Sequence, residues 1–208
     1  MTSKLPAPFF SRRYIGHRFS LILGLSALNL AIGAVVSLLK LPIYLDSIGI
    51  VITAIVLGII PGILCGAITC GVGFFLVNPY LPAYFGTSIV IALLASFCRR
   101  LNLFRSLPFA IVSGLIIALG AALASAPVTA FLFGGATLSG VDAITAFFVS
   151  SGKAILESVL YAGFASEPVD KILVCLIAFG VLRSLPSSFY SRNGLRSYRD
   201  DTTKDKAI

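Results

Sequence analysis

The side chains that could do chemistry in this sequence are few, and they lie beside long apolar stretches. Asp46 immediately precedes an apolar run, and Tyr44 comes two residues earlier. A charge at the centre of a bilayer costs at least about 2.5–3.5 kcal/mol, so such residues are rare and usually functional. At a helix start, the same carboxylate can instead cap free backbone N–H groups. Asp46 is therefore expected either to cap a helix or to contact a substrate, Lys40 or Lys153.

Other polar and aromatic side chains occur in similar positions. Tyr80 and Tyr84 fall in the loop "NPYLPAYFG", where they could stack on a flat heterocycle or belong to an aromatic belt at the membrane interface. Lys153 and Glu157 are four residues apart, which predicts an ion pair on one helix face or, alternatively, a ligand-facing pair. Asn29 is expected to hydrogen-bond inside the bundle. The candidate substrate-binding residues are Asn29, Tyr44, Asp46, Asn78, Tyr80, Tyr84, Lys153 and Glu157.

Catalytic arrangements find little support. The segment "SSGKA" lacks the upstream glycine of a phosphate-binding loop and has Ala154 where Ser or Thr should follow the lysine. The only histidine, His17, lies on a basic flank, which argues against histidine metal sites and Ser-His or Cys-His catalysis. Four cysteines are expected to be small core residues: Cys65, Cys70, Cys98 and Cys175. The sequence predicts no enzyme, no catalytic residue, no metal and no cofactor.

Composition identifies the solvent around these residues as lipid. The chain has 208 residues, of which 58% are hydrophobic and 12% charged, and its mean hydropathy is +1.01. A soluble domain of this length could not bury so much apolar surface. Long apolar runs without strict alternation favour helices over a barrel. We therefore predict an all-α integral membrane protein.

The net charge of +8 comes from short basic segments flanking the apolar runs. Such flanks orient helices by the positive-inside rule and imply no nucleic-acid partner. The three basic clusters in these flanks are Lys4, Arg12, Arg13 and Arg18, then Arg99, Arg100 and Arg105, then Arg183, Arg192, Arg196 and Arg199. Both termini are therefore predicted to be cytoplasmic, in a multi-pass protein of the inner (cytoplasmic) membrane.

Apolar segments and turn residues predict a compact bundle of about six transmembrane helices. A turn is expected at Pro61-Gly62 and a kink at Pro127. The predicted spans are 19–39, 46–60, 62–77, 87–98, 107–133 and 169–182, with 143–165 as an additional re-entrant or interfacial segment joined to the last span by "SEPVDK". A seven-span arrangement remains an alternative.

The predicted organisation has three parts: a basic cytoplasmic segment at 1–18, the helical domain at 19–186 and a polar, disordered cytoplasmic tail at 187–208. Three loops would face outward, at 40–45, 78–86 and 134–141. They concentrate tyrosine, proline and small polar residues. This asymmetry predicts a site open to the exterior.

Small residues recur at helical spacing in two places. Ala27 and Ala31 are one turn apart in "ALNLA", which would allow close approach of another helix, either within the bundle or from a partner. Gly58, Gly62 and Gly66 repeat every four residues. They are expected to let the second and third helices cross tightly, with no ligand role.

Several segments together resemble the substrate-binding membrane subunit, the S component, of energy-coupling factor (ECF) vitamin transporters. They are "ALNLA", "LPIYLDSIG", "LGIIPGILCGAITCG", "NPYLPAYFG" and "SEPVDKILVCLIAFGVLRSLP", and the resemblance covers most of residues 19–186. It departs from the family at Ile59, where many members have proline after the glycine, at Ile50, where threonine is expected, and in the extra segment 143–165.

The resemblance implies a six-helix bundle without catalytic activity that binds a vitamin or related small organic micronutrient from the outer side. It implies a T component and two ATPase subunits as partners, with Ala27 and Ala31 packing on the T component. Nickel- and cobalt-specific members use an N-terminal histidine that is absent here, which favours an organic substrate. The alternative hypotheses are a membrane sensor or a structural subunit of another complex, followed by a membrane enzyme.

Overall fold

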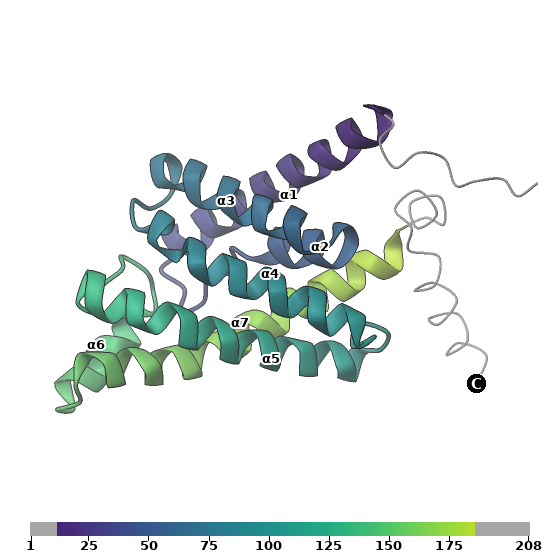
Figure 1. The fold of residues 1–208 in the computed structure, drawn as a ribbon. Coiled ribbons are helices and arrows are strands. Elements are labelled where there is room, and N and C mark those ends of the chain that lie inside the picture. Colours follow the sequence, from purple (N-terminus) through teal and green to yellow (C-terminus); the bar gives the residue numbers. More distant parts are fainter. Residues whose placement is uncertain (1–11, 186–208) are drawn as a thin grey trace, which may run out of the picture.

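The computed structural model describes residues 12–185, and this part of the chain is helical throughout, without strands (Figure 1). The predicted tail at 187–208 and the first eleven residues of the predicted 1–18 segment lie outside it. The elements are α1 (Arg12–Leu38), α2 (Ile48–Leu57), α3 (Ile59–Leu76), a 3₁₀ turn η1 (Leu81–Tyr84), α4 (Phe85–Arg100), α5 (Leu107–Pro127), a π-helical turn η2 (Val128–Leu132), α6 (Asp142–Ser150) and α7 (Ile155–Ser184).

Within residues 12–185, four segments are long and apolar enough to cross a membrane: Gly16–Leu38, Ile59–Leu76, Leu81–Arg100 and Leu107–Leu132. By length and composition, the fold is that of a helical membrane protein. Helix α2 has only 10 residues, about half the length that a bilayer requires. Helix α7 has 30 residues, or about 45 Å at 1.5 Å per residue, but carries charged residues in its middle.

The junction between α2 and α3 differs from the prediction. Instead of turning at Pro61-Gly62, the chain breaks at Gly58, whose φ of 105° lies in the region that favours glycine. Pro61 lies in the first turn of α3, where a missing backbone N–H costs no helical hydrogen bond. The predicted second span, 46–60, is therefore a shorter helix with nine of its ten residues buried.

The arrangement predicted for 143–182 is also wrong. The re-entrant segment at 143–165 is divided between α6 and the first turns of α7, and "SEPVDK" lies inside α7 rather than between two segments. Its Lys171 lies 3.1 Å from Glu167, one turn away, so these charges are paired along the helix. Pro168 is accommodated within α7. At Pro127, where a kink is predicted, α5 gives way to the π-helical turn η2.

Glycines let the helices approach closely. The predicted tight crossing of the second and third helices is confirmed at Gly62, but not at Gly58, where a β-carbon would have no neighbour within 4 Å, and the close contact of Gly66 is with α4. A β-carbon at position 62 would lie 2.8 Å from the Cβ of Ala54 in α2, and one at position 66 would lie 2.8 Å from the Cβ of Ser88 in α4. Helix α3 thus packs on both α2 and α4. The four cysteines are buried and free, and three of them, Cys65, Cys98 and Cys175, belong to the main apolar core.

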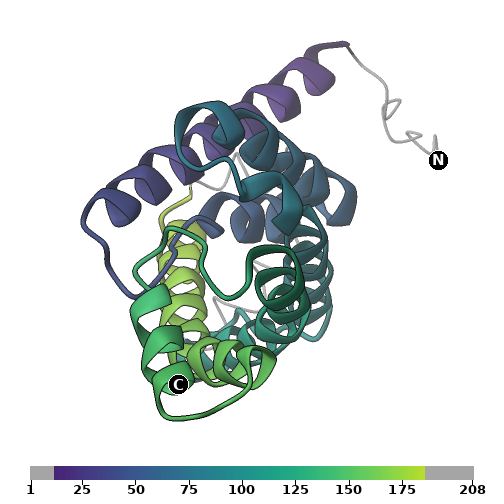
Figure 2. The ribbon, with the colours of Figure 1, turned by 90° about the vertical axis from the view of Figure 1, so that its left-hand side faces the viewer.

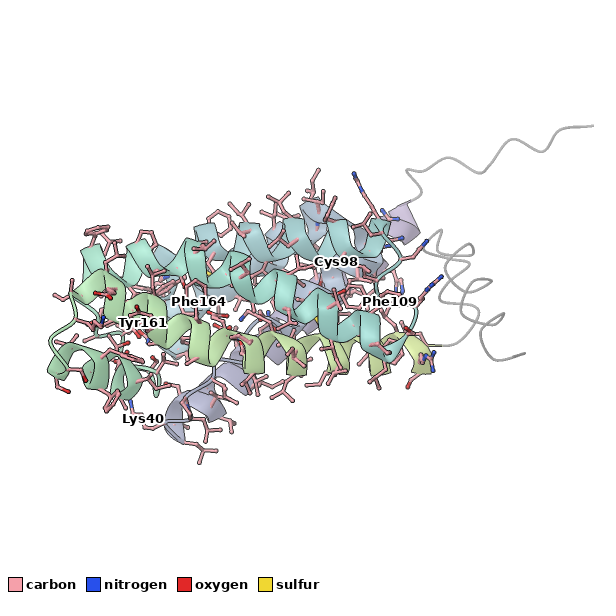
Figure 3. All side chains as sticks on the ribbon, turned by 90° about the horizontal axis from the view of Figure 1, so that it is seen from below. Lys40, Cys98, Phe109, Tyr161 and Phe164 are labelled. Carbon is pink, nitrogen blue, oxygen red and sulfur yellow. The ribbon has the colours of Figure 1, made fainter. Side chains whose placement is uncertain are left out.

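The two ends of the bundle differ in character. The start of α1, the α4–α5 turn and the end of α7 lie together at one end (Figure 1), where an Arg183 guanidinium nitrogen donates to the Arg105 carbonyl at 3.3 Å. The loops 39–47, 77–84 and 133–141 gather at the opposite end, which Figure 2 faces. Figure 3 shows Lys40 and Tyr161 toward this loop end. It shows Phe109 toward the opposite end, which carries Arg105 and Arg183 and is here called the basic end.

Candidate functional site

A cavity of about 130 Å³ opens among the helices at the loop end. An engineered apolar cavity of roughly 150 Å³ holds benzene, so a molecule with one ring would fit a space of this size. The lining comes from α1, α2, α3, α4, α5, α7 and the three loops of that end. Its polar and aromatic members include Asn29, Ser37, Tyr44, Asp46, Ser47, Thr69, Cys70, Asn78, Tyr80, Tyr84, Thr87, Ser88, Ser125, Thr137, Ser139, Glu167 and Lys171.

Six of the eight candidate substrate-binding residues therefore lie around one cavity: Asn29, Tyr44, Asp46, Asn78, Tyr80 and Tyr84. They come from α1, two loops and η1. The other two, Lys153 and Glu157, do not line it. Their carboxylate–ammonium distance is 2.9 Å and their side chains are 44% and 41% exposed. The predicted ion pair is thus confirmed, but it lies on the surface, where its hydrogen bond raises the pKa of Lys153.

Asn29 joins three helices beneath the cavity. Its side chain is fully buried, its carbonyl oxygen accepts a hydrogen bond from the Gly49 N–H at 2.6 Å, and its amide donates to the Thr69 hydroxyl at 3.3 Å. Gly49 allows this contact because a β-carbon there would lie 2.8 Å from the Leu25 carbonyl carbon. The predicted hydrogen bonding of Asn29 inside the bundle is confirmed.

Three tyrosines form the aromatic part of the lining. Tyr80 stacks on Phe133 with ring centres 4.5 Å apart, and Tyr84 lies 6.0 Å from the same ring. The Tyr84 hydroxyl is 2.8 Å from that of Thr129. Burial, followed by the charge of Glu167, raises the pKa of Tyr44, so its phenol stays protonated and able to donate. Phe133 therefore packs against the rings of both Tyr80 and Tyr84.

The three loops hold one another at the cavity mouth. The Asn78 amide donates to the Thr137 carbonyl at 2.9 Å. The Asp142 carboxylate accepts from the Thr137 N–H at 2.9 Å and from the Thr137 hydroxyl at 2.8 Å. Lys40 donates to the Leu138 carbonyl at 3.0 Å, and Gly140 lies directly on the backbone of Leu41. These contacts connect 39–47, 77–84 and 133–141 across long sequence separations.

A group of four charged residues, here called the charge cluster, lies at the side of the cavity formed by α7. It consists of Asp46, Glu167, Asp170 and Lys171. Lys171 contacts the Asp170 carboxylate and lies 3.1 Å from Glu167 Oε2. Asp170 also accepts a hydrogen bond from the Leu45 N–H at 2.7 Å. The three residues of α7 are 4%, 0% and 2% exposed in chain order, so this is an ionic group inside the protein.

Asp46 belongs to this cluster rather than to a helix cap. The residue capping α2 is Ser47, which makes no side-chain capping bond. Of the two lysines expected near Asp46, Lys40 bonds to the Leu138 carbonyl and Lys153 pairs with Glu157. Asp46 instead lines the cavity together with Glu167 and Lys171, and it follows Leu45, whose N–H donates to Asp170. The capping and lysine-contact predictions are therefore wrong, whereas the predicted contact with a substrate stays a prediction.

Some polar atoms around the cavity lack a hydrogen-bond partner within the part of the chain that the structure describes. They are the hydroxyl oxygens of Ser47 and Thr87 and one carboxylate oxygen, Oε2, of Glu167. Glu167 Oε2 is near Lys171, but the approach does not have hydrogen-bond geometry. Buried polar groups in native proteins are normally satisfied, and each exception needs an explanation. A ligand with hydrogen-bonding groups would supply one.

Sequence analysis missed Glu167, Asp170 and Lys171 as site residues. Their spacing of i, i+3 and i+4 places them on one helix face, and that spacing within an apolar flank was the available signal. The segment "SEPVDK", which contains all three residues, was instead interpreted as a linker between two helical segments. No family model, curated protein or solved structure matches this chain, so the cavity itself carries the functional argument.

Proposed function

We propose that the protein captures a small organic solute, as the substrate-binding S component of an ECF-type ABC importer. The carrying observation is the cavity at the loop end, which combines three tyrosines, a charge cluster and unpartnered polar atoms. Ligand sites are typically concave and mostly apolar, with a few placed polar groups. The ligand would be a vitamin or related micronutrient.

Binding suits this lining better than catalysis does. Cys70 and Ser88 reach the cavity and lie 3.6 Å apart, but in the described part of the chain neither is hydrogen-bonded to a side chain that could act as the base activating a nucleophile. The single histidine, His17, is in the first turns of α1, toward the basic end (Figure 1). In the proposed function the energy for transport comes from two ATPase subunits and not from this chain.

The proposed T-component contact is on α1. Gly24, Ala27 and Ala31 are exposed along this helix, and a β-carbon at position 24 would have no neighbour within 4 Å. Helix α1 packs on α2 and α3, which leaves this stripe of small residues facing away from the bundle. Small residues let a partner helix approach closely within a membrane.

The proposed orientation places the basic end in the cytoplasm and the cavity outside. Arg99, Arg100, Arg105 and Arg183 lie at the end opposite the cavity. Lys and Arg are enriched in cytoplasmic loops, so the positive-inside rule supports this assignment. A solute could then enter from the exterior of the cytoplasmic membrane.

The ligand-binding proposal is tested by filling the cavity. Thr87 lines it, and its hydroxyl has no partner in the described residues, so Thr87→Phe occupies space without removing a hydrogen bond there. A deproteinised small-molecule extract from the source cells should stabilise the purified wild-type protein, by about 2.7 kcal/mol if a ligand reaches 100 times its Kd. The measurement is thermal unfolding in detergent with and without extract.

The matched control is Leu93→Phe, on an exposed face of the same helix, α4. We expect Leu93→Phe to keep the stabilisation and Thr87→Phe to lose it. Absence of stabilisation in the wild-type protein, or equal stabilisation in both variants, would count against the cavity as the binding site.

The partner proposal is tested by adding bulk to the stripe. Ala27→Leu and Ala31→Leu should reduce copurification of the T component and ATPase subunits from native membranes by about tenfold or more, since a close helix contact worth at least ~1.4 kcal/mol is lost. Leu28→Ala, an exposed change on the neighbouring face of α1, is the control. Unchanged recovery of these partners with both leucine variants would remove Ala27 and Ala31 from the interface.

A further inference from the structure

The charges around the cavity are unbalanced. The cluster contains three carboxyl groups, those of Asp46, Glu167 and Asp170, and one ammonium, that of Lys171, for a formal charge of −2 when all are ionised. Without a cation in the cavity, buried carboxylates take up protons instead, and burial raises the pKa of Asp46 accordingly. Asp142 adds a carboxylate behind the Thr137 and Ser139 part of the mouth. A further cation at this mouth, Lys40, is exposed and donates to the Leu138 carbonyl. Buried charge without compensation is costly.

From this imbalance we propose that the captured solute is a small organic cation, with one ring and a protonated or quaternary nitrogen. The inference rests on the proposed function and specifies its substrate class. Lys171 already contacts Asp170 and Glu167, so it offers little to an anionic ligand. A cation in the cavity would compensate the excess negative charge.

The unpartnered acceptors independently favour a donor ligand. Glu167 Oε2 lies 3.1 Å from the Lys171 ammonium but accepts no hydrogen bond of good geometry from the described residues, and its side chain is 4% exposed and lines the cavity. An ionised carboxylate only accepts, so this oxygen has room for a further N–H or O–H donor. Hydrogen bonds between a cationic donor and a carboxylate are roughly twice as strong as neutral ones. The hydroxyls of Ser47 and Thr87 can serve the remaining polar atoms of the ligand.

The tyrosines support the same class of ligand. Tyr44, Tyr80 and Tyr84 surround the cavity together with the cluster. A cation within about 6 Å of an aromatic face gains from roughly 0.5–1 kcal/mol at exposed sites to 2 or more when desolvated. The 4.5 Å stacking of Tyr80 on Phe133 holds one of these rings in place. Aromatic faces and carboxylates together favour a cation over a neutral molecule of the same shape.

Three probes of nearly equal size separate charge from shape: benzylamine, which is a cation at neutral pH, benzyl alcohol, which is neutral, and benzoate, an anion. Each is a single benzene ring, close in size to a cavity of about 130 Å³, with a short polar substituent that can extend toward the open mouth. Binding is measured by ligand-observed NMR titration of the protein in lipid nanodiscs, with the signal from empty nanodiscs subtracted. Benzylamine should bind about tenfold or more tightly than benzyl alcohol, and benzoate should not bind.

Two variants remove one negative charge each without changing shape. Asp46→Asn and Glu167→Gln should bring the affinity ratio of benzylamine to benzyl alcohol close to one. Glu157→Gln makes the same chemical change at the exposed pair with Lys153, outside the cavity, and should leave the ratio unchanged. If Glu167→Gln does not fold, Asp46→Asn decides the outcome, because within residues 12–185 the Asp46 side chain makes no hydrogen bond to another residue that the change would break.

The inference is overturned if benzyl alcohol or benzoate binds as tightly as benzylamine, if benzylamine does not bind, or if Asp46→Asn keeps the preference for the cation. The proposed function is judged separately. A neutral or anionic molecule retained by the purified protein and lost in Thr87→Phe would leave solute capture intact while excluding a cationic substrate.

Discussion

Replacing Lys171 by methionine is expected to lower the free energy of unfolding by about 3–5 kcal/mol, or to prevent folding. Lys171 is 2% exposed and is the single ammonium of the charge cluster. Its loss leaves Asp46, Glu167 and Asp170 close together without a positive partner. Removing one member of a buried ion pair is strongly destabilising because the remaining charge stays buried and uncompensated. The measurement is thermal unfolding of the purified protein in detergent, with monodispersity as the test of folding.

The matched control is Lys153→Met, which breaks the exposed pair with Glu157. An exposed ion pair adds little to stability, so this variant should unfold at the wild-type temperature. The two variants make the same chemical change to a lysine that pairs with a glutamate four residues away. Equal unfolding temperatures for Lys171→Met and Lys153→Met would show that the cluster is not an ionic group held inside the protein.

Gly114→Ala is expected to lower the free energy of unfolding by about 1–3 kcal/mol, through overpacking between α5 and α7. A β-carbon at position 114 would lie 2.7 Å from Ile172 Cα, 2.9 Å from the Ile172 nitrogen and 2.9 Å from the Lys171 carbonyl oxygen. All three are backbone atoms, so α7 must move as a whole. Because Lys171 belongs to the charge cluster, the same displacement should weaken ligand binding.

Gly180→Ala provides the control in α7 itself, since a β-carbon there would have no neighbour within 4 Å. Alanine is the better helix former by up to about 1 kcal/mol, so this variant should be as stable as the wild-type protein or slightly more stable. The comparison uses the same unfolding measurement. A Gly114→Ala protein with wild-type stability would mean that α5 and α7 do not approach as closely as the structure shows.

Much of the helical layout could be predicted from residue types alone. Long apolar runs predicted helices in α1, α3, α4 and α5. The glycine spacing predicted the close packing of α3 on α2 at Gly62 but not the packing of Gly66 on α4. Asn29 was expected to bond within the bundle because a polar amide inside a membrane protein needs partners. These features depend on the residues of a single helix, whose spacing of three to four residues per turn can be recognised in the sequence. The resemblance to ECF S components, by contrast, remains a prediction.

The continuous helix α7 could not be predicted in the same way. Glu167, Pro168 and Asp170 are typical of a loop when each residue is considered alone, but in the structure they lie within α7. The helix continues because Lys171 pairs with acidic residues on its own face. Such pairing depends on packing against Leu45 and Asp46, more than 120 positions earlier in the chain. The spacing in the sequence shows that these charged residues share one face of α7, but it does not show which distant segment packs against that face and buries it.

The candidate site was predicted in part for a similar reason. Tyr44, Tyr80 and Tyr84 were selected because loops on one side of a membrane share that side, and the cavity includes all three. Lys153 was selected by charge and by its apolar surroundings, but it precedes α7 at an exposed turn. Which polar residues face inward depends on the orientation of each helix, and that orientation is set by contacts such as Gly49 on Leu25.

Native mass spectrometry of the protein purified without added ligand tests the central claim most directly. If the cavity captures a solute, the wild-type protein and Leu93→Phe should carry one small organic molecule each, and Thr87→Phe should carry none. A wild-type protein free of any small-molecule adduct, with no adduct gained after incubation with the cell extract, would contradict solute capture. An adduct that Thr87→Phe retains would place the binding site elsewhere in the molecule.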